Sequence, residues 1–309
     1  MVKTGGKKKK AAALLAAGIG AAAVLFLLRP LFKPDEPGPP SPPPIEEKVG
    51  DKRTIEDEKV PAPAVKPQDV DTTIAKSAAV KPTTAARIAV IIDDVGYESD
   101  TMNEFSRFEG KLTFSVLPFM THSREYAEIL YDRGFEIMLH IPMEPLDYPD
   151  HDPGEGALYT WDRREDVLAK LDTMVSDTPH IRGANNHMGS KATGDEELMG
   201  WTLSYLKSRD LYFIDSFTTA DSVAYEKAVN MAMKTGRRDI FLDNENNFSS
   251  INGQFEKLKA IALEEGSAVA IGHFQNENTV KVLNHQLPML RSEGIELVFA
   301  SELVRVTRE

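Results

Sequence analysis

The sequence predicts an α/β fold in which parallel strands alternate with helices, as a deformed (β/α) barrel of seven or eight strands. Two observations carry this prediction: short apolar, β-branched runs recur from residue 86 onward, and an amphipathic helical pattern separates most of them. Residues 86–309 provide the length that such a barrel needs, and an open doubly wound sheet is the second choice. No GxGxxG follows the first run and no GxxxxGK[ST] occurs, which disfavours nucleotide binding.

The predicted strands are short runs rich in Val, Ile, Leu and Phe. They are Ile88–Ile92, Leu112–Leu117, Phe135–Leu139, Leu211–Ile214, Ile240–Leu242, Ala268–Ile271 and Ile295–Phe299, with a weaker candidate at Gly183–Met188. The predicted helices space their apolar residues three or four apart, and several end at a glycine. They are Glu125–Asp132, Arg164–Val175, Glu196–Lys207, Gln254–Glu264 and Val280–Leu290.

The amino-terminal segment predicts attachment to a membrane. Residues 1–10 form a basic tip with five lysines, and residues 11–28 follow without a charge. A membrane-spanning helix needs about 17–25 apolar residues, and flanking lysines favour the cytoplasmic side. We therefore expect a single-pass bacterial inner-membrane protein whose carboxy-terminal domain lies in the periplasm. The alternative is a signal peptide cleaved near Ala21–Ala23, but the apolar run continues beyond that point.

Residues 29–85 predict a disordered, proline-rich linker. They hold twelve of the 19 prolines and few apolar residues, so they favour an extended spacer over a packed structure. Residues 86–309 are then expected to form the single folded domain.

Composition excludes several functional classes. The 309-residue chain has a net charge of −12, which argues against a generally basic nucleic-acid-binding protein. It has no cysteine, so disulfides, thiolate catalysis and iron–sulfur clusters are absent from this sequence. Any metal site in it must use oxygen and imidazole ligands.

Polar side chains able to perform chemistry follow directly after most of the apolar runs. They are Asp93, Asp94, His140, Asn185, Asn186, His187, Asp215, Asp243 and His273. In a parallel barrel the carboxyl ends of the strands converge on one face, so we expect these side chains to meet in one pocket. A carboxylate with two imidazoles suits a catalytic divalent metal, commonly Zn²⁺.

Each of these residues also has a structural explanation when taken alone. A carboxylate after a strand is often a helix N-cap, and Asp215 and Asp243 are favoured as caps or as groups that orient other side chains. A single histidine is more often packed and hydrogen-bonded than a ligand. The pair Asp93 and Asp94 differs, because adjacent buried carboxylates repel unless a cation or proton separates them.

Five local strings resemble the divergent polysaccharide deacetylase family, a branch of the carbohydrate esterases of the nodulation-factor deacetylase type. They are IIDDVG, FSVLPF, LHIPMEP, NNHMGS and IGHF, which occur in consistent order within residues 86–309. The resemblance implies a deformed (β/α) barrel and a metal-dependent hydrolase that removes N-acetyl groups from a carbohydrate polymer.

The resemblance also implies roles for individual residues. Asp93 corresponds to the catalytic base, Asp94 and His140 to metal ligands, and His273 to the acid that protonates the leaving amine. The family's H-x-x-x-H motif has Glu144 in place of its second histidine. The third ligand must therefore be Glu144, which is retained as a catalytic candidate, or come from elsewhere, with His187 the first choice. The usual arginine-bearing motif is not evident, and Asn185 and Asn186 occupy its approximate place, as candidates for orienting the others.

Three functions remain open from the sequence. The first is a membrane-tethered deacetylase of an envelope carbohydrate, with a sugar groove lined by aromatic side chains and a loop at 148–161 over the site. The aromatic candidates are Tyr97, Tyr148, Tyr159 and Trp161. The second is a catalytically weak or inactive barrel that binds glycan or regulates the envelope as a scaffold. The third is a glycoside hydrolase using Asp215 and Asp243, which requires them to lie roughly 5–10 Å apart.

Overall fold

The structure of the protein, a computed structural model, describes residues 85–306. The predicted basic tip, membrane anchor and proline-rich linker lie outside these residues. Within the described part of the chain, no helix combines the length and apolar character that crossing a membrane requires.

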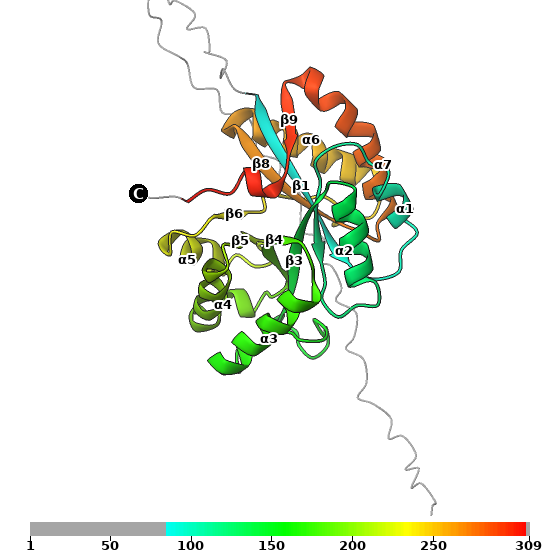
Figure 1. Cartoon of the computed structure of the whole chain (residues 1–309). Coiled ribbons are helices and arrows are strands. Elements are labelled where there is room, and N and C mark those ends of the chain that lie inside the picture. The colour runs from blue at the N-terminus through cyan, green and yellow to red at the C-terminus, as the bar shows by residue number, and fades with distance from the viewer. Residues whose placement is uncertain (1–84, 307–309) are drawn as a thin grey trace, which may run out of the picture. The chain divides into compact units, whose positions relative to one another are not determined.

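The fold is built on one curled sheet of parallel strands (Figure 1). The strands are β1 (Ala86–Val95), β2 (Thr113–Val116), β3 (Glu136–Met143), β4 (Ile181–Met188), β5 (Tyr212–Asp215), β6 (Thr235–Arg237), β7 (Ile240–Phe241), β8 (Ser267–His273) and β9 (Ile295–Val298). Eight of them follow the order β6-β5-β4-β3-β2-β1-β8-β7, and β9 pairs with the first half of β1.

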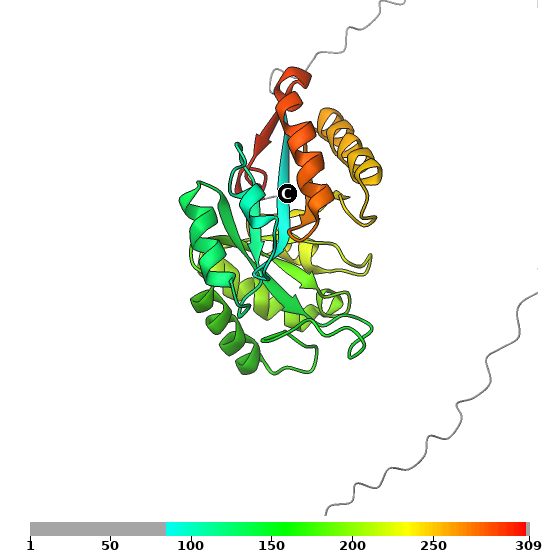
Figure 2. The same cartoon turned by 90° about the vertical axis from the view of Figure 1, so that its right-hand side faces the viewer.

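Helices connect the strands and pack around the sheet, as the two views together show (Figures 1 and 2). They are α1 (Met102–Phe105), α2 (Ser123–Asp132), α3 (Arg164–Asp177), α4 (Glu196–Ser208), α5 (Ala224–Asn230), α6 (Phe248–Glu265) and α7 (Glu277–Gln286). Short 3₁₀ turns lie at Ala192–Gly194, Leu287–Glu293 and Ala300–Glu302.

The curl of the sheet follows from its connectivity. β6 and β7 are the two ends of the strand order, yet only Arg238 and Asp239 separate them in the chain. Two residues span only a short distance, so the two ends of the sheet must approach one another. The parallel, curled arrangement is consistent with a (β/α) barrel, although β6 and β7 do not pair directly.

The strands alternate between an outer and an inner apolar face. On β1, Ile88, Val90 and Ile92 pack outward in the cluster that contains Phe255 of α6. The intervening Ala89 and Ile91 belong to a separate inner cluster that also contains Met138, Ile214 and Ile271. Side chains along a strand point alternately to opposite faces, so the next inward position on β1 is Asp93.

The predicted strands and longer helices all occur, with boundaries shifted by a few residues. The structure adds β6, α1 and α5, which the sequence analysis did not anticipate. β6 reads Thr-Gly-Arg and has no apolar run, α1 has four residues, and α5 has seven. Such short elements depend on their neighbours for stability, and their own sequences carry little periodic signal.

Gly183 on β4 is required by close packing against a buried tyrosine. A Cβ atom there would lie 2.4 Å from the ring of Tyr212, whose hydroxyl donates to Glu136 at 2.9 Å. We expect Gly183→Ala to lower the free energy of unfolding by about 1–3 kcal/mol, because the ring must shift. Gly253→Ala, in α6 with open space around the new methyl, should instead stabilise by about 0.5–1 kcal/mol. Urea unfolding measures both, and equal stability of Gly183→Ala and the parent would contradict the packing.

Candidate metal centre

The inward-facing residues change from apolar to polar at the carboxyl end of the sheet. His140 follows Met138 by two positions on β3, and His273 follows Ile271 by two on β8. Asp93 is the Cα partner of His273 across the β1–β8 ladder, and His140 is the partner of Asn185 across β3–β4. The alternation of strand side chains thus places these polar groups in one layer above the inner apolar cluster.

Asp94 reaches the same layer through a local irregularity in β1. Regular alternation would turn the side chain after Asp93 to the outer face. The β1–β2 register shifts between Ile92 and Val95, and Asp94 adopts a φ of +64° in the left-handed region. Such a conformation costs roughly 1–3 kcal/mol for a non-glycine residue and is found preferentially at functional sites.

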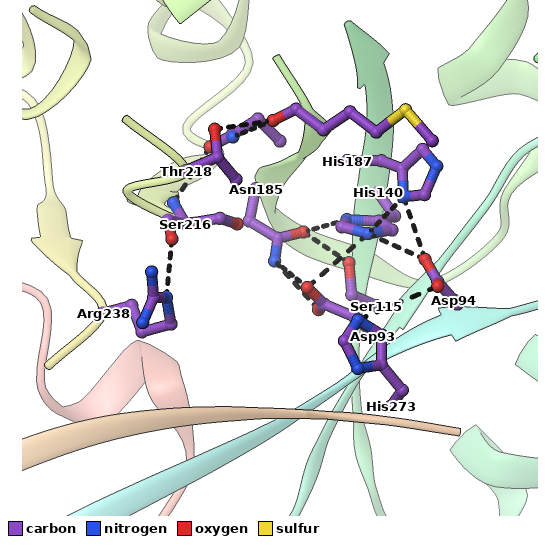
Figure 3. A network of polar contacts seen from close by, with 12 residues as sticks. Asp93, Asp94, Ser115, His140, Asn185, His187, Ser216, Thr218, Arg238 and His273 are labelled. Carbon is purple, nitrogen blue, oxygen red and sulfur yellow. Dashed lines mark hydrogen bonds and ion pairs between the residues drawn. The ribbon is translucent and has the colours of Figure 1, made fainter. Parts of the chain in front are cut away.

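Asp94, His140 and His187 each present one ligand atom to the others (Figure 3). His140 Nε2 lies 3.2 Å and His187 Nδ1 lies 3.0 Å from Asp94 Oδ1. The two imidazole nitrogens are 3.3 Å apart. The structure therefore brings together three of the residues that the sequence analysis named as metal ligands.

This triangle suits a tetrahedrally coordinated ion. Zinc bonds of about 2.0–2.1 Å to nitrogen and oxygen place neighbouring ligand atoms about 3.3 Å apart, close to the three separations observed here. Asp94 Oδ1 is buried and has no hydrogen-bond partner among residues 85–306. An unsatisfied carboxylate oxygen beside two imidazole nitrogens is the donor set expected for a divalent metal. The residues present therefore fit a metal of this kind.

The side-chain amide of Asn185 orients Asp93 and His140 (Figure 3). Its Nδ2 donates to both oxygens of Asp93, at 2.9 and 3.2 Å, so its Oδ1 must face the opposite side. That oxygen accepts from Ser115 Oγ at 2.6 Å and from His140 Nδ1 at 2.7 Å. Because an amide oxygen only accepts, His140 carries a proton on Nδ1, and Nε2, which faces Asp94 and His187, is the nitrogen that can bind a metal.

Asp93 is buried beside the ligand triangle without being part of it. The residue is 4% exposed, and its Oδ2 lies 3.5 Å from His140 Nε2. Burial raises the pKa of Asp93, and the nearby charge of Asp94 adds to this, whereas His140 and Asn185 oppose it. Burial alone would raise the pKa of Asp94, but the adjacent His140 and His187 imidazoles outweigh burial and hold this pKa far below its usual range.

His273 is held by Asp243 on the other side of Asp94. Its Nδ1 lies 2.9 Å from Asp243 Oδ1, and its backbone N–H donates to Oδ2. Its Nε2 points toward Asp94 Oδ2 at 3.9 Å. Burial lowers the pKa of His273, but the hydrogen bond and charge of Asp243 outweigh it and raise the pKa to about 9. His273 therefore carries a proton at neutral pH in the structure.

Asn186 and Asp215 organise the neighbouring loops. Asn186 Nδ2 donates to the Met188 carbonyl, and its Oδ1 accepts from Ser216 N–H. The Asp215 carboxylate is fully buried and accepts from Phe217 N–H, Ser222 Oγ and Tyr225 N–H. With Asp215 engaged in its own loop and Asp243 bound to His273, neither carboxylate is free to act on a glycosidic bond.

Glu144 does not join the metal-ligating group. Its Oε2 accepts from the backbone N–H and the hydroxyl of Thr160, and its Oε1 pairs with Lys191 at 2.7 Å. The side chain is almost completely buried in these contacts. Glu144 thus ties the end of β3 to the loop before α3, while His187 occupies the position beside Asp94 and His140.

The ligand triangle and His273 line one pocket of about 500 Å³ at the carboxyl end of the strands. Its wall also includes residues that sequence reasoning did not single out: Phe217, Arg238 and Phe241. Ser115 was likewise given no role, although it lies in one of the strings that carry the family resemblance. Arg238 lies in the two-residue link between β6 and β7. The residues of β6 contain no apolar run, so the sequence does not show that a strand ends just before Arg238. A larger cleft, of about 1050 Å³, lies near the amino-terminal ends of β1 and β9 and contains none of these residues.

Comparison with known proteins identifies the family. The divergent polysaccharide deacetylase family matches residues 90–304. The chain is 33% identical to YibQ of Escherichia coli K12 over 224 residues, which cover 72% of this chain and 69% of YibQ. The chain belongs to the divergent polysaccharide deacetylase family. The match spans every strand that contributes to the pocket, from β1 to β8, and confirms the resemblance found in the sequence.

Two further comparisons agree with membership of the divergent polysaccharide deacetylase family. An uncharacterized protein of Haemophilus influenzae is 32% identical over 220 residues, covering 71% of this chain and 77% of its own length. The crystal structure of ATU2773 from Agrobacterium tumefaciens C58 superposes with a TM-score of 0.69 at 22% identity, covering 72% of this chain and 91% of ATU2773. At that identity, the likeness shows a shared fold.

Asp243 raises the pKa of His273, so replacing Asp243 should change that pKa measurably. In Asp243→Asn the pKa of His273 should fall from about 9 toward its ordinary value of about 6.5, because the neighbouring charge is lost. A histidine-selective NMR titration measures this change. Asp239→Asn is the matched control, since that carboxylate accepts from Val269 N–H on the same side of β8 and should leave His273 near 9. An unchanged His273 pKa in Asp243→Asn would contradict the assignment.

Proposed function

We propose that this protein is a divalent-metal-dependent hydrolase, with Zn²⁺ as the metal, that removes N-acetyl groups from a carbohydrate polymer of the cell envelope. One observation carries the proposal: three ligand atoms converge within 3.0–3.3 Å, with a buried carboxylate and a protonated histidine beside them. This arrangement supports amide hydrolysis, because that reaction needs a base for water and an acid for the leaving nitrogen. Membership of the family supports the class of substrate.

The metal would be held by Asp94 Oδ1, His140 Nε2 and His187 Nδ1. Three protein ligands leave a tetrahedral position open, as catalytic zinc sites require. When bound, such an ion supplies Lewis acidity, polarising the acetyl carbonyl and lowering the pKa of water toward about 7. The Asn185 amide keeps the His140 ring turned so that its Nε2 lone pair faces the ion.

Asp93 would accept a proton from water, and His273 would donate a proton to the leaving nitrogen. The raised pKa of Asp93 makes its carboxylate a better acceptor for the proton of the attacking water, whose oxygen bonds to the acetyl carbon. The bond between that carbon and nitrogen then breaks, and His273 donates its proton to the leaving nitrogen. Acetate and a free amine are the products. Asp243 stabilises the protonated imidazole before donation and orients the ring.

An aromatic cluster near the end of β3 offers a stacking surface for a sugar, although its rings are not among the residues that line the 500 Å³ pocket. The Tyr159 and Trp161 rings stack at 4.5 Å, and Tyr148 packs against both. Trp161 is 59% exposed, so its ring is available to a sugar. The Glu144 contacts with Thr160 and Lys191 hold this loop against the strand that carries His140. Tyr97, the fourth aromatic candidate from the sequence, is exposed and is not part of the stack.

We also propose that residues 11–28 tether the protein to a bacterial inner membrane, with residues 86–309 forming its periplasmic domain beyond a proline-rich spacer at 29–85. The uncharged segment at 11–28, with the lysine cluster before it, supports this topology. An envelope carbohydrate would then lie within reach of the domain.

Acetate release tests the proposed function. The full chain in neutral detergent, supplied with Zn²⁺, should release acetate from N-acetylglucosamine oligosaccharides or N-acetylated cell-wall glycan. Chelation should abolish release and added Zn²⁺ should restore it. Asp93→Asn should lower the rate by about 10²–10⁴-fold, because the general base is lost. Asp239→Asn, which alters a carboxylate outside the pocket, should keep the parental rate.

Absence of acetate from every glycan tested, with the metal bound, would overturn the hydrolase proposal. If the same protein bound those glycans, the result would favour the alternative of a glycan-binding scaffold. Full activity of Asp93→Asn would overturn the role of Asp93 alone.

A further inference from the structure

Arg238 presents a positive charge to the pocket on the side away from the ligand triangle. Its Nε donates to the Ser216 carbonyl at 2.6 Å, and its Nη2 donates to the Phe217 carbonyl at 2.8 Å. These contacts hold the guanidinium and leave its Nη1 without a hydrogen-bond partner among residues 85–306. Within the same residues, no carboxylate lies within 4.0 Å of it. Figure 3 shows Arg238 and Ser216 on one side of the Asp93–Asn185 pair, with Asp94 and His187 on the other.

Ser216 adds an unused hydroxyl to the same wall. The residue is only 4% exposed and lines the pocket, yet its Oγ has no hydrogen-bond partner in the described structure. Leaving a buried hydroxyl unpaired costs about 1–3 kcal/mol, so such a group commonly forms a hydrogen bond with a ligand or with water. Its backbone N–H is held by Asn186, and its carbonyl accepts from Arg238. The hydroxyl and the guanidinium are therefore fixed relative to each other.

Arg238 is the only lysine or arginine that lines this pocket in the described part of the chain. Asp93, Asp215 and Asp239 act on its charge only from beyond ion-pair distance. The ring of Phe241 contacts both Arg238, which lies over it at 5.0 Å, and His273, whose ring is nearly perpendicular to it at 5.1 Å. The positive charge is thus confined to one part of the wall.

We propose that Arg238 and Ser216 form a subsite for a carboxylate, so that the preferred substrate is an N-acetylated amino sugar that bears an acidic group. This inference rests on the proposed function for the choice of a sugar as ligand. A carboxylate has two oxygens, which match the two free donors, Arg238 Nη1 and Ser216 Oγ.

Direct binding tests the subsite without relying on catalysis. The zinc-loaded full chain in detergent is titrated calorimetrically with the methyl glycoside of N-acetylglucosamine and with two acidic derivatives. One derivative carries the carboxylate at carbon 6 and the other carries it on a lactyl ether at carbon 3. We expect at least one acidic sugar to bind about tenfold or more tightly than the neutral one, since hydrogen bonds to charged groups contribute about 1.5–3 kcal/mol.

Variants separate the subsite from simple attraction to the metal. Arg238→Gln should reduce the preference for the acidic sugar to near one, and Ser216→Ala should reduce it about threefold or more. Ser216→Ala removes a hydroxyl that has no partner, so it should fold normally and keeps the test decisive even if Arg238→Gln unfolds. Arg237→Gln is the matched control, because the exposed Arg237 lies over the rings of Phe217 and Tyr225 and does not line the pocket.

Equal affinity for neutral and acidic sugars in the parent would overturn the inference. It would also be overturned if Ser216→Ala left the preference undiminished, since the carboxylate would then bind elsewhere, for example at the metal. Failure of the proposed function has a different signature: an acidic sugar would bind through Arg238 and Ser216, but no acetate would be released.

Discussion

The side-chain amide of Asn185 determines, through its hydrogen bonds, how Asp93 and His140 are oriented in the pocket. The amide nitrogen must face Asp93, because a carboxylate only accepts, and its oxygen must therefore face Ser115 and His140. One buried side chain thus holds Asp93, the proposed base, and orients His140 so that its Nε2 can bind a metal. Reversing the amide would set its oxygen against Asp93 and its nitrogen against the His140 proton. Ser115, from β2, donates to the same oxygen.

The inner layer of the sheet explains how residues distant in the sequence reach this amide. Alternation along β1, β3 and β8 places Asp93, His140 and His273 above the apolar interior. This part of the site could be predicted from the sequence, because each polar residue follows an apolar run and parallel strands share one carboxyl edge. Asp94 breaks the alternation through its left-handed φ. The sequence indicates this irregularity only indirectly, because the adjacent carboxylates Asp93 and Asp94 would repel each other when buried.

Other features depend on tertiary contacts that have no local signature. Glu144 stands where the family motif has a histidine, and only its contacts with Thr160 and Lys191 reveal that it holds a loop. His187 and Glu144 are alternatives for the third ligand in the sequence alone, and only the register of β3 with β4, which pairs His187 with Pro142, favours His187. Arg238 could not be found from the sequence, because β6 is three residues long and the sheet must curl before the β6–β7 link reaches the pocket. Short strands of this kind are specified by their neighbours rather than by their own residues.

The metal-ligating role of Asp94, His140 and His187 is the claim on which the proposed chemistry depends most. The most direct measurement is the zinc content of the purified full chain and of matched variants after equilibration with limiting Zn²⁺. One equivalent is expected in the parent and in Glu144→Gln. In His187→Ala and Asp94→Asn, affinity should fall more than about 100-fold, since even groups that only support ligands contribute about 10–100-fold. Retention of zinc by His187→Ala together with its loss from Glu144→Gln would contradict the assignment, as would a parent that binds none.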